Sequence, residues 1–305
     1  MARILPTLLV LALLGCTAAA FAVTEGLKLE KSPIGDTTVE KVVAPDSVEN
    51  ASASIRFLLR RPDTLTVQII NGSGDVVAGL ASNTRRARGV QTFSWNGRDD
   101  SGQVVPDGTY RPRVHLARER RTIVLPNPIR MDATAPLIKL VSVLPLVFSP
   151  DGDGRSDFPR IQYKTNERAR AVVYVNGEQR AEVKRYVRAG KYDWRGRAVR
   201  RLAPGRYRIR LRALDLATNL GPASRALTVV VRYVELRPHL LRVRTGKRFG
   251  VRVDTDAKRY AVHLGRLHDL RSGRFVYLRA PAPGRYVLRV AAAGHTAKAL
   301  VVVRP

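Results

Sequence analysis

The chain has 305 residues, with 54 Lys and Arg against 25 Asp and Glu, and a formal net charge of +29. A hydrophobic fraction of 45% supplies enough apolar side chains for packed cores, so the chain is not a disordered basic tail. The single cysteine, Cys16, excludes an intramolecular disulfide and any zinc or iron–sulfur site built on several cysteines. The length fits about two domains of average size, or three small ones.

Residues 1–22 predict an export signal, because Arg3 precedes an apolar run that ends in small residues. Two processing routes stay open. Cleavage can follow Ala20-Phe21-Ala22, or lipidation can occur at Cys16, since Leu13-Leu14-Gly15-Cys16 resembles the bacterial lipobox. Retention of the run as an uncleaved membrane anchor is a third route. All three place the rest of the chain outside the cytoplasmic membrane, and we expect residues 23–42 to form an exposed lead-in linker.

Residues 43–231 contain an internal repeat. The pattern Ile55-x-Phe57 followed by Leu65-x-Val67-x-Ile69 recurs, at a constant offset of 106 residues, as Ile161-x-Tyr163 and Ala171-x-Val173-x-Val175. Each copy is followed by an Asn-Gly pair, which predicts a tight hairpin turn. Both copies then carry a Trp-x-Gly motif and a Gly-x-Tyr segment: Trp95, Gly97, Gly108 and Tyr110 in the first, Trp194, Gly196, Gly205 and Tyr207 in the second. A third, partial copy at Pro283-Gly284-Arg285-Tyr286 has no preceding Trp.

The alternation of apolar and polar residues in these segments predicts short strands, each with one buried face. Many such strands, separated by turn residues, are typical of sandwiches. We therefore predict an all-β fold of tandem antiparallel sandwiches. The modules are expected at residues 43–131, 132–231 and 232–305, and the two Trp residues are expected to pack inside their cores.

The run at residues 95–110 resembles the Ig-like module of flagellar hook-capping proteins, whose signature is approximately W-x-G-x-D-x-x-G-x-x-V-P-x-G-x-Y. Residues 148–157 are similar to the opening loop of such modules in bacterial surface proteins, and residues 215–219 to the ending of bacterial Ig-like repeats. The first copy lacks that opening loop, and the second lacks the Asp after its Trp-x-Gly. The resemblance covers about 43–231. It implies Ig-like sandwiches and an extracytoplasmic scaffold or binding role, not hook capping.

Asp151, Asp153 and Asp157 form a D-x-D-G-x-x-D loop, in which three carboxylates can converge on one Ca²⁺. The alternative is a turn whose side chains bind their own backbone. Asp99, Asp100 and Asp107 flank the Trp95 motif and can in principle do acid–base chemistry. Because Gly residues surround them, we expect these three to cap turns.

Arg206, Arg208, Arg210 and Arg212 alternate with apolar residues, which predicts four guanidinium groups on the solvent face of one strand. Residues 232–305 carry 17 basic and 4 acidic residues, so the positive charge is concentrated in the third module. Such a field attracts polyanions. The alternative is that the arginines only keep the surface well solvated and bind no partner.

These observations predict an exported, non-catalytic scaffold or binding protein of the cell envelope. Its partner would be an envelope polymer or a surface protein, and its membrane contact would be confined to the N-terminus. One alternative is a protein that binds polyanions through the Arg-rich third module. Another is an accessory module of a wall-polysaccharide enzyme. The sequence has no nucleophile-elbow, zinc-protease or phosphate-loop motif, so we expect neither catalysis nor a cofactor other than Ca²⁺. We do not expect nucleic acid as the partner, because aromatic residues make up only 6% of the chain.

Overall fold

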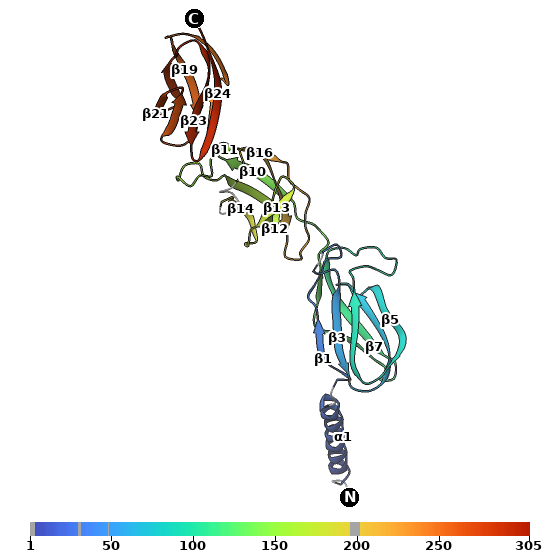
Figure 1. Ribbon diagram of the computed structural model, residues 1–305. Helices are drawn as coiled ribbons and strands as arrows, with labels where there is room; N and C mark the ends of the chain where they lie inside the picture. Colours follow the sequence, from blue (N-terminus) through green and yellow to red (C-terminus); the bar gives the residue numbers. More distant parts are fainter. Residues whose placement is uncertain (1–3, 30–31, 48, 196–201) are drawn as a thin grey trace. The chain divides into compact units, whose positions relative to one another are not determined.

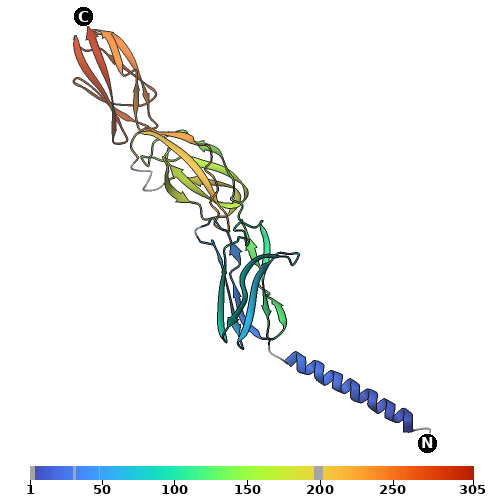
Figure 2. The ribbon, with the colours of Figure 1, turned by 90° about the vertical axis from the view of Figure 1, so that its right-hand side faces the viewer.

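The computed structural model of the protein describes residues 4–29, 32–47, 49–195 and 202–305. The chain divides into two compact units, Met1–Thr134 and Ala135–Pro305. Helix α1 (Ile4–Leu29) is followed, throughout the described part of the chain, by strands that pair into sheets (Figures 1 and 2). The predicted all-β class of antiparallel sandwiches is confirmed.

The first unit holds one sandwich. Its strands are β1 (Ile34–Val39), β2 (Val42–Val43), β3 (Ala53–Leu59), β4 (Asp63–Ile70), β5 (Val76–Arg86), β6 (Gly89–Trp95), β7 (Gly108–Leu116), β8 (Arg121–Val124) and β9 (Ile129–Met131). One sheet has the order β1-β3-β6 and the other β2-β9-β7-β4-β5, with β8 added beside β7. All pairs are antiparallel except β2 with β9. Strands β3 and β4 bury every second residue, so their apolar faces meet in a single core.

The second sandwich begins the second unit. Its strands are β10 (Ile138–Leu144), β11 (Val147–Phe148), β12 (Arg160–Val175), β13 (Glu178–Glu182), β14 (Val187–Asp193), β15 (Gly205–Leu214) and β16 (Leu227–Val231). Strand β12 is 16 residues long. Its first half pairs with β10 and β14, and its second half pairs with β13 and β15. One continuous strand therefore takes part in both layers, where the first sandwich uses the separate strands β3 and β4.

The third sandwich completes the second unit. Its strands are β17 (Glu235–Arg237), β18 (Leu240–Arg244), β19 (Arg248–Asp254), β20 (Tyr260–Leu264), β21 (Leu267–Arg271), β22 (Phe275–Arg279), β23 (Gly284–Ala292) and β24 (His295–Arg304). They form a sheet of order β17-β19-β22 and a sheet of order β18-β24-β23-β20-β21. The buried apolar residues between the two sheets form a core of their own.

A tyrosine contact recurs in all three sandwiches. The hydroxyl of Tyr110 donates to the carbonyl oxygen of Pro106 at 2.8 Å. The hydroxyls of Tyr207 and Tyr286 donate in the same way to carbonyls four residues upstream, at 2.9 Å each. Each contact fixes the turn that leads into β7, β15 or β23, so the Gly-x-Tyr segment acts as a repeated corner.

The structure differs from the expected boundaries at both ends of the repeat. Within residues 23–42, α1 extends to Leu29 and β1 pairs with β3, burying Ile34 and Val39 in the first core. The β1 segment therefore belongs to the first sandwich. The sequence did not predict this strand, because its alternation of apolar and polar residues is short. Tyr233, assigned to the third module, packs in the core of the second.

The two Asn-Gly pairs form different turns. Asn176 and Gly177 both have positive φ, 52° and 91°, and close the tight hairpin between β12 and β13, as predicted. In the first copy the positive φ falls at Gly74 instead, and the side chain of Asn71 accepts hydrogen bonds from the amides of Ser73 and Asp75. The prediction of a two-residue hairpin was wrong there, because the Asn71 amide side chain stabilises a longer loop.

Candidate functional site

The described apolar side chains of the N-terminal helix, within residues 9–21, are exposed to solvent. Leu9, Leu13 and Phe21 are each about two-thirds exposed, and Cys16 is an exposed free thiol. In the described part of the chain, no helix combines the length and apolarity needed to cross a membrane.

The repeated motif residues lie mainly inside the sandwiches. Trp95 is 1% exposed, its ring centroid lies 5.2 Å from that of Tyr110, and its indole N–H donates to the carbonyl of Arg98 at 2.9 Å. Trp194 is buried between Phe148 and Tyr207. Both indoles therefore pack in cores and are not available to stack on a sugar.

The motif glycines have different surroundings. Gly97 has a φ of 74°, and a Cβ there would lie 2.8 Å from the Met131 sulfur and from Val43. Gly108 and Gly205 begin the strands that carry the two corner tyrosines. Gly196 lies outside the described residues.

The acidic loop brings its three carboxylates together. Oxygens of Asp151, Asp153 and Asp157 all lie within 4.8 Å of one another. Asp157 accepts from the amides of Gly152 and Gly154 at 2.6 and 2.8 Å, and Asp151 accepts from the amide of Asp153 at 3.1 Å. Burial raises the pKa of Asp151, and the neighbouring Asp153 and Asp157 carboxylates raise it further. The loop thus has self-capping turns and, in addition, a concentration of negative charge.

A fourth carboxylate, which the sequence analysis did not select, lies beside this loop. Both carboxylate oxygens of Asp256 are buried, and neither accepts a hydrogen bond of good geometry from the described residues. Burial raises the Asp256 pKa to about 6, and the Asp151 carboxylate contributes to the rise. The Ser149 hydroxyl, which hydrogen-bonds to Asp151 at 3.2 Å, also lies close enough to Asp256 to offset part of the rise in its pKa, and Arg155 donates to the backbone carbonyl of Asp256. No basic side chain among the described residues forms a salt bridge with this carboxylate.

Asp99 caps its own turn as expected, whereas Asp100 and Asp107 bind backbone amides of distant segments. Asp99 accepts from the amides of Ser101 and Gln103, and the Ser101 hydroxyl bond lowers its pKa. Asp100 accepts from the amide of Gly79 at 2.8 Å, and Asp107 from the amide of Ala133 at 2.6 Å. Since all three carboxylates bind backbone amides, their arrangement favours structural support over acid–base chemistry.

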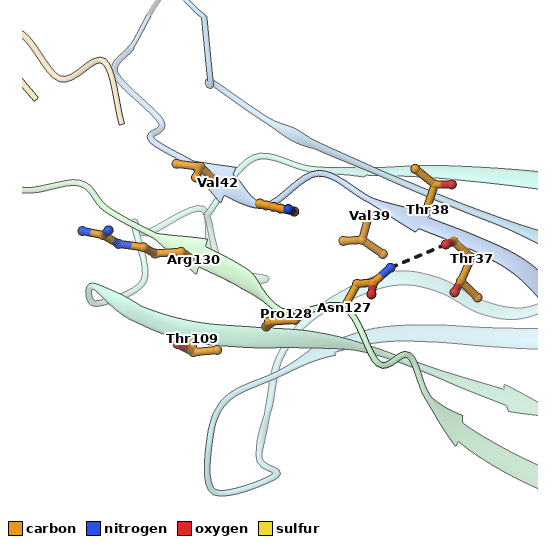
Figure 3. Close-up of a pocket in the computed structure, with 9 residues that line it drawn as sticks. Thr37, Thr38, Val39, Val42, Thr109, Asn127, Pro128 and Arg130 are labelled. Carbon is orange, nitrogen blue, oxygen red and sulfur yellow. Dashed lines mark hydrogen bonds between the residues drawn. The ribbon is translucent and has the colours of Figure 1, made fainter. Parts of the chain in front are cut away.

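A hollow of about 560 Å³ opens on the first sandwich, beside β1, β2 and β9 (Figure 3). Its lining consists of Thr37, Thr38, Val39, Lys41, Val42, Thr109, Asn127, Pro128 and Arg130. Asn127 crosses it to donate to the carbonyl of Thr37 at 3.5 Å, and Arg130 binds Asp132 at 2.8 Å. The lining is mostly apolar, with Lys41 and Arg130 as its charged side chains, and it holds no carboxylate, histidine or thiol.

The arginine row on β15 faces solvent along most of its length. Arg206, Arg208 and Arg210 are exposed, and within the described residues none of them has a carboxylate within salt-bridge distance. Arg212 is half-buried and donates to the carbonyl of Gly221 at 2.7 Å. Three of the four predicted guanidinium groups are thus free to meet an anion.

The outer face of β19 and β22 is a further surface that the sequence analysis missed. Phe275 and Tyr277 are 53% and 55% exposed, and the guanidinium carbon of Arg248 lies 4.7 Å from the Tyr277 ring centroid. In the segment 275–279, aromatic residues alternate with aliphatic residues, so the sequence alone did not show which of the two groups would face the core. Phe275 and Tyr277 alternate with Val276 and Leu278, so both faces of this strand carry large apolar side chains. This pattern was the signal in the sequence that one of the two pairs would be exposed.

The geometry of the first sandwich agrees with a known module. Residues 44–119 match the family model of the FlgD Ig-like domain. The resemblance seen in the Trp95 to Tyr110 motif is therefore confirmed for this part of the chain. No curated protein matches the chain.

Several solved structures are similar at low identity. FlgD from P. aeruginosa is 24% identical, with 37% of this chain and 82% of that chain covered and a TM-score of 0.23. The BSP domain of a biofilm associated protein is 16% identical, with coverage of 65% and 29% and a TM-score of 0.24. The Bacteroides ovatus protein SGBP-B, solved with a mixed-linkage heptasaccharide, is 13% identical, with coverage of 88% and 67% and a TM-score of 0.28. The chain thus spans less than a third of the biofilm associated protein, and scores this low transfer no function.

Proposed function

We propose that the protein acts outside the cytoplasmic membrane as a non-catalytic binding protein, and that its partner is an anionic polymer of the cell envelope. Residues 1–22 direct export, with processing at Cys16 or after Ala22. The sandwiches then serve as rigid supports for charged sheet faces.

The observation that carries this proposal is the exposed, unpaired arginine row of β15. A surface arginine held by a carboxylate adds little attraction for a distant anion, whereas unpaired arginines on one face add their fields. Arg206, Arg208 and Arg210 meet this condition. Arginine also presents a planar fork of N–H donors that matches carboxylate and phosphate groups.

Export is tested by fusing residues 1–31 to a reporter enzyme that needs disulfide bonds, which form only outside the bacterial cytoplasm. We expect an active reporter, and an inactive one when residues 4–22 are deleted from the same fusion. Binding is tested by passing the full chain over immobilised polygalacturonate and over neutral dextran. Retention on the dextran alone, or an inactive intact fusion, would contradict the proposal.

We also infer that the acidic loop binds Ca²⁺, with Asp256 as an additional ligand to Asp151, Asp153 and Asp157. Ca²⁺ prefers oxygen ligands, and all four side chains supply them. The buried Asp256 oxygens favour this reading over simple turn capping, because a buried carboxylate without a salt-bridge partner is costly and a bound cation would neutralise it. Each loop carboxylate also keeps lone pairs beyond those used by the amides.

Thermal melts of the full chain in chelator and in CaCl₂ test this site. We expect Ca²⁺ at about 1 mM, the range of extracellular modules, to raise the melting temperature of the second unit. The variant Asp153→Asn should lose the increase. Asp99→Asn, which removes a turn-capping carboxylate from the first unit, is the matched control and should keep it. A melting temperature that does not respond to Ca²⁺ would show that the carboxylates only cap their turn.

A further inference from the structure

The outward positions of β19 and β22 form a compact surface. Arg248 pairs across the strands with Arg279, Gly250 with Tyr277, and Arg252 with Phe275. Since side chains alternate along a strand, these residues share one face, while Phe249, Val251, Val276 and Leu278 point into the core. We call Arg248, Phe275, Tyr277 and Arg279 the aromatic face.

The two rings of the aromatic face lie side by side. Their centroids are 6.3 Å apart, with an angle of 24° between the planes. A Cβ at Gly250 would lie 2.9 Å from Cε1 of Tyr277, so this ring extends across the neighbouring strand. The Tyr–Gly pair can support the sheet, but it does not explain the exposure of Phe275. Two adjacent half-exposed aromatic side chains form the kind of apolar surface that marks a binding site.

The charges on this face are also unusual. Arg237 and Arg252 are held by Asp254, at 3.4 and 2.8 Å. Arg248 and Arg279 face each other directly and have no carboxylate within salt-bridge distance in the described part of the chain. Like charges in opposite cross-strand positions destabilise a sheet. The opposed charges of Arg248 and Arg279 therefore repel each other, and an anion bound between them would remove this repulsion.

We infer that the aromatic face binds an acidic polysaccharide. Sugar rings present C–H faces that can pack on Tyr277 and Phe275, and the uronate carboxylates would be bound by Arg248 and Arg279. Stacking of the Arg248 guanidinium on Tyr277 limits its freedom and leaves its N–H groups available to a carboxylate. The choice of a polysaccharide over a nucleic acid, which also stacks and is also anionic, rests on the proposed function outside the cytoplasmic membrane.

The test is isothermal titration of the full chain with defined oligogalacturonates. We expect Phe275→Ala/Tyr277→Ala and Arg248→Ala/Arg279→Ala each to bind at least about tenfold more weakly than wild type, as loss of stacking or of charge-assisted hydrogen bonds implies. The matched control is Arg61→Ala/Arg180→Ala, which removes the same formal charge from two surface arginines that are paired with Glu119 and Glu178, and it should change the affinity less than about twofold. Circular dichroism checks that each variant is folded. Phe275→Ala alone replaces the aromatic double variant if that one does not fold, because Phe275 does not pack on Gly250.

The outcomes separate this inference from the proposed function. If the wild type binds oligogalacturonate but the aromatic variants bind equally well, or the control loses as much as Arg248→Ala/Arg279→Ala, the inference is wrong and the general proposal stands. Tighter binding of single-stranded DNA of matched charge would also overturn the inference. If the wild type binds no anionic polymer, both fall.

Discussion

Replacing Trp95 tests whether the first sandwich is closed around its own aromatic core. Trp95 is 1% exposed and contacts Tyr110, and its N–H bond to Arg98 is satisfied within the domain. Truncation of a buried Trp to Ala costs about 3–5 kcal/mol, and the Arg98 carbonyl loses a partner as well. Domains of this size are stable by about 5–15 kcal/mol, so Trp95→Ala should remove a large part of the stability of the first unit.

The assay is a thermal melt of the full chain, followed by circular dichroism and tryptophan fluorescence. At about 4–8 °C per kcal/mol for a small domain, the transition of the first unit should fall by at least about 12 °C. Trp194 is then the remaining tryptophan and reports on the second unit, whose transition should not move. Trp194→Ala is the matched variant and should give the opposite pattern. An unchanged melt for Trp95→Ala would refute the packing described here.

Three further predictions concern single residues. Gly97→Ala should lower the unfolding free energy by about 2–4 kcal/mol, because Gly97 has a positive φ and a Cβ there would contact Met131 closely. Gly74→Ala is the control: Gly74 also has a positive φ but open space around it, so the loss should be only about 1 kcal/mol. Urea denaturation measures both values. In chelator, the wild-type unfolding free energy should rise as the pH falls from about 7 to about 4. The reason is that the raised pKa of Asp256 makes the folded state hold its proton more tightly than the unfolded state. The rise should be about 1–3 kcal/mol, and Asp256→Asn should reduce it to the part that the raised pKa of Asp151 supplies. A rise of the same size in Asp256→Asn would show that another group titrates. Cys16→Ser should remove any lipid mass from the protein recovered from its native cells, as read by intact-mass spectrometry. If the wild type instead starts at Val23, the lipidation route is wrong.

Much of the fold could be predicted because the same residue types recur at corresponding positions of the two copies. Trp95 and Tyr110 recur at matching places, and the alternation around them has the period of a strand. The corner tyrosines are local contacts across four residues, so the motif alone determines their geometry. The β1 strand was missed because its alternation is short and it is stabilised by its partner β3 and not by its own sequence.

The candidate sites depended on contacts that the sequence does not encode locally. Asp151, Asp153 and Asp157 are close in sequence, so their convergence was predictable from the loop. Asp256 lies about 100 residues further along the chain, and packing inside the second unit brings it near enough to Asp151 for the two charges to interact. The aromatic face was missed for another reason. The register between β19 and β22 determines whether the aromatic or the aliphatic residues of 275–279 face solvent, and the sequence does not show this register.

The central claim is that unpaired arginines on sheet faces bind an anionic envelope polymer. It is tested most directly by titrating the full chain with polygalacturonate over a range of about 50 to 200 mM salt. The account predicts a logarithm of affinity that falls linearly and steeply with the logarithm of salt, together with no measurable binding to neutral dextran at any salt. An affinity that does not respond to salt, or that is equal for the two polymers, would contradict it.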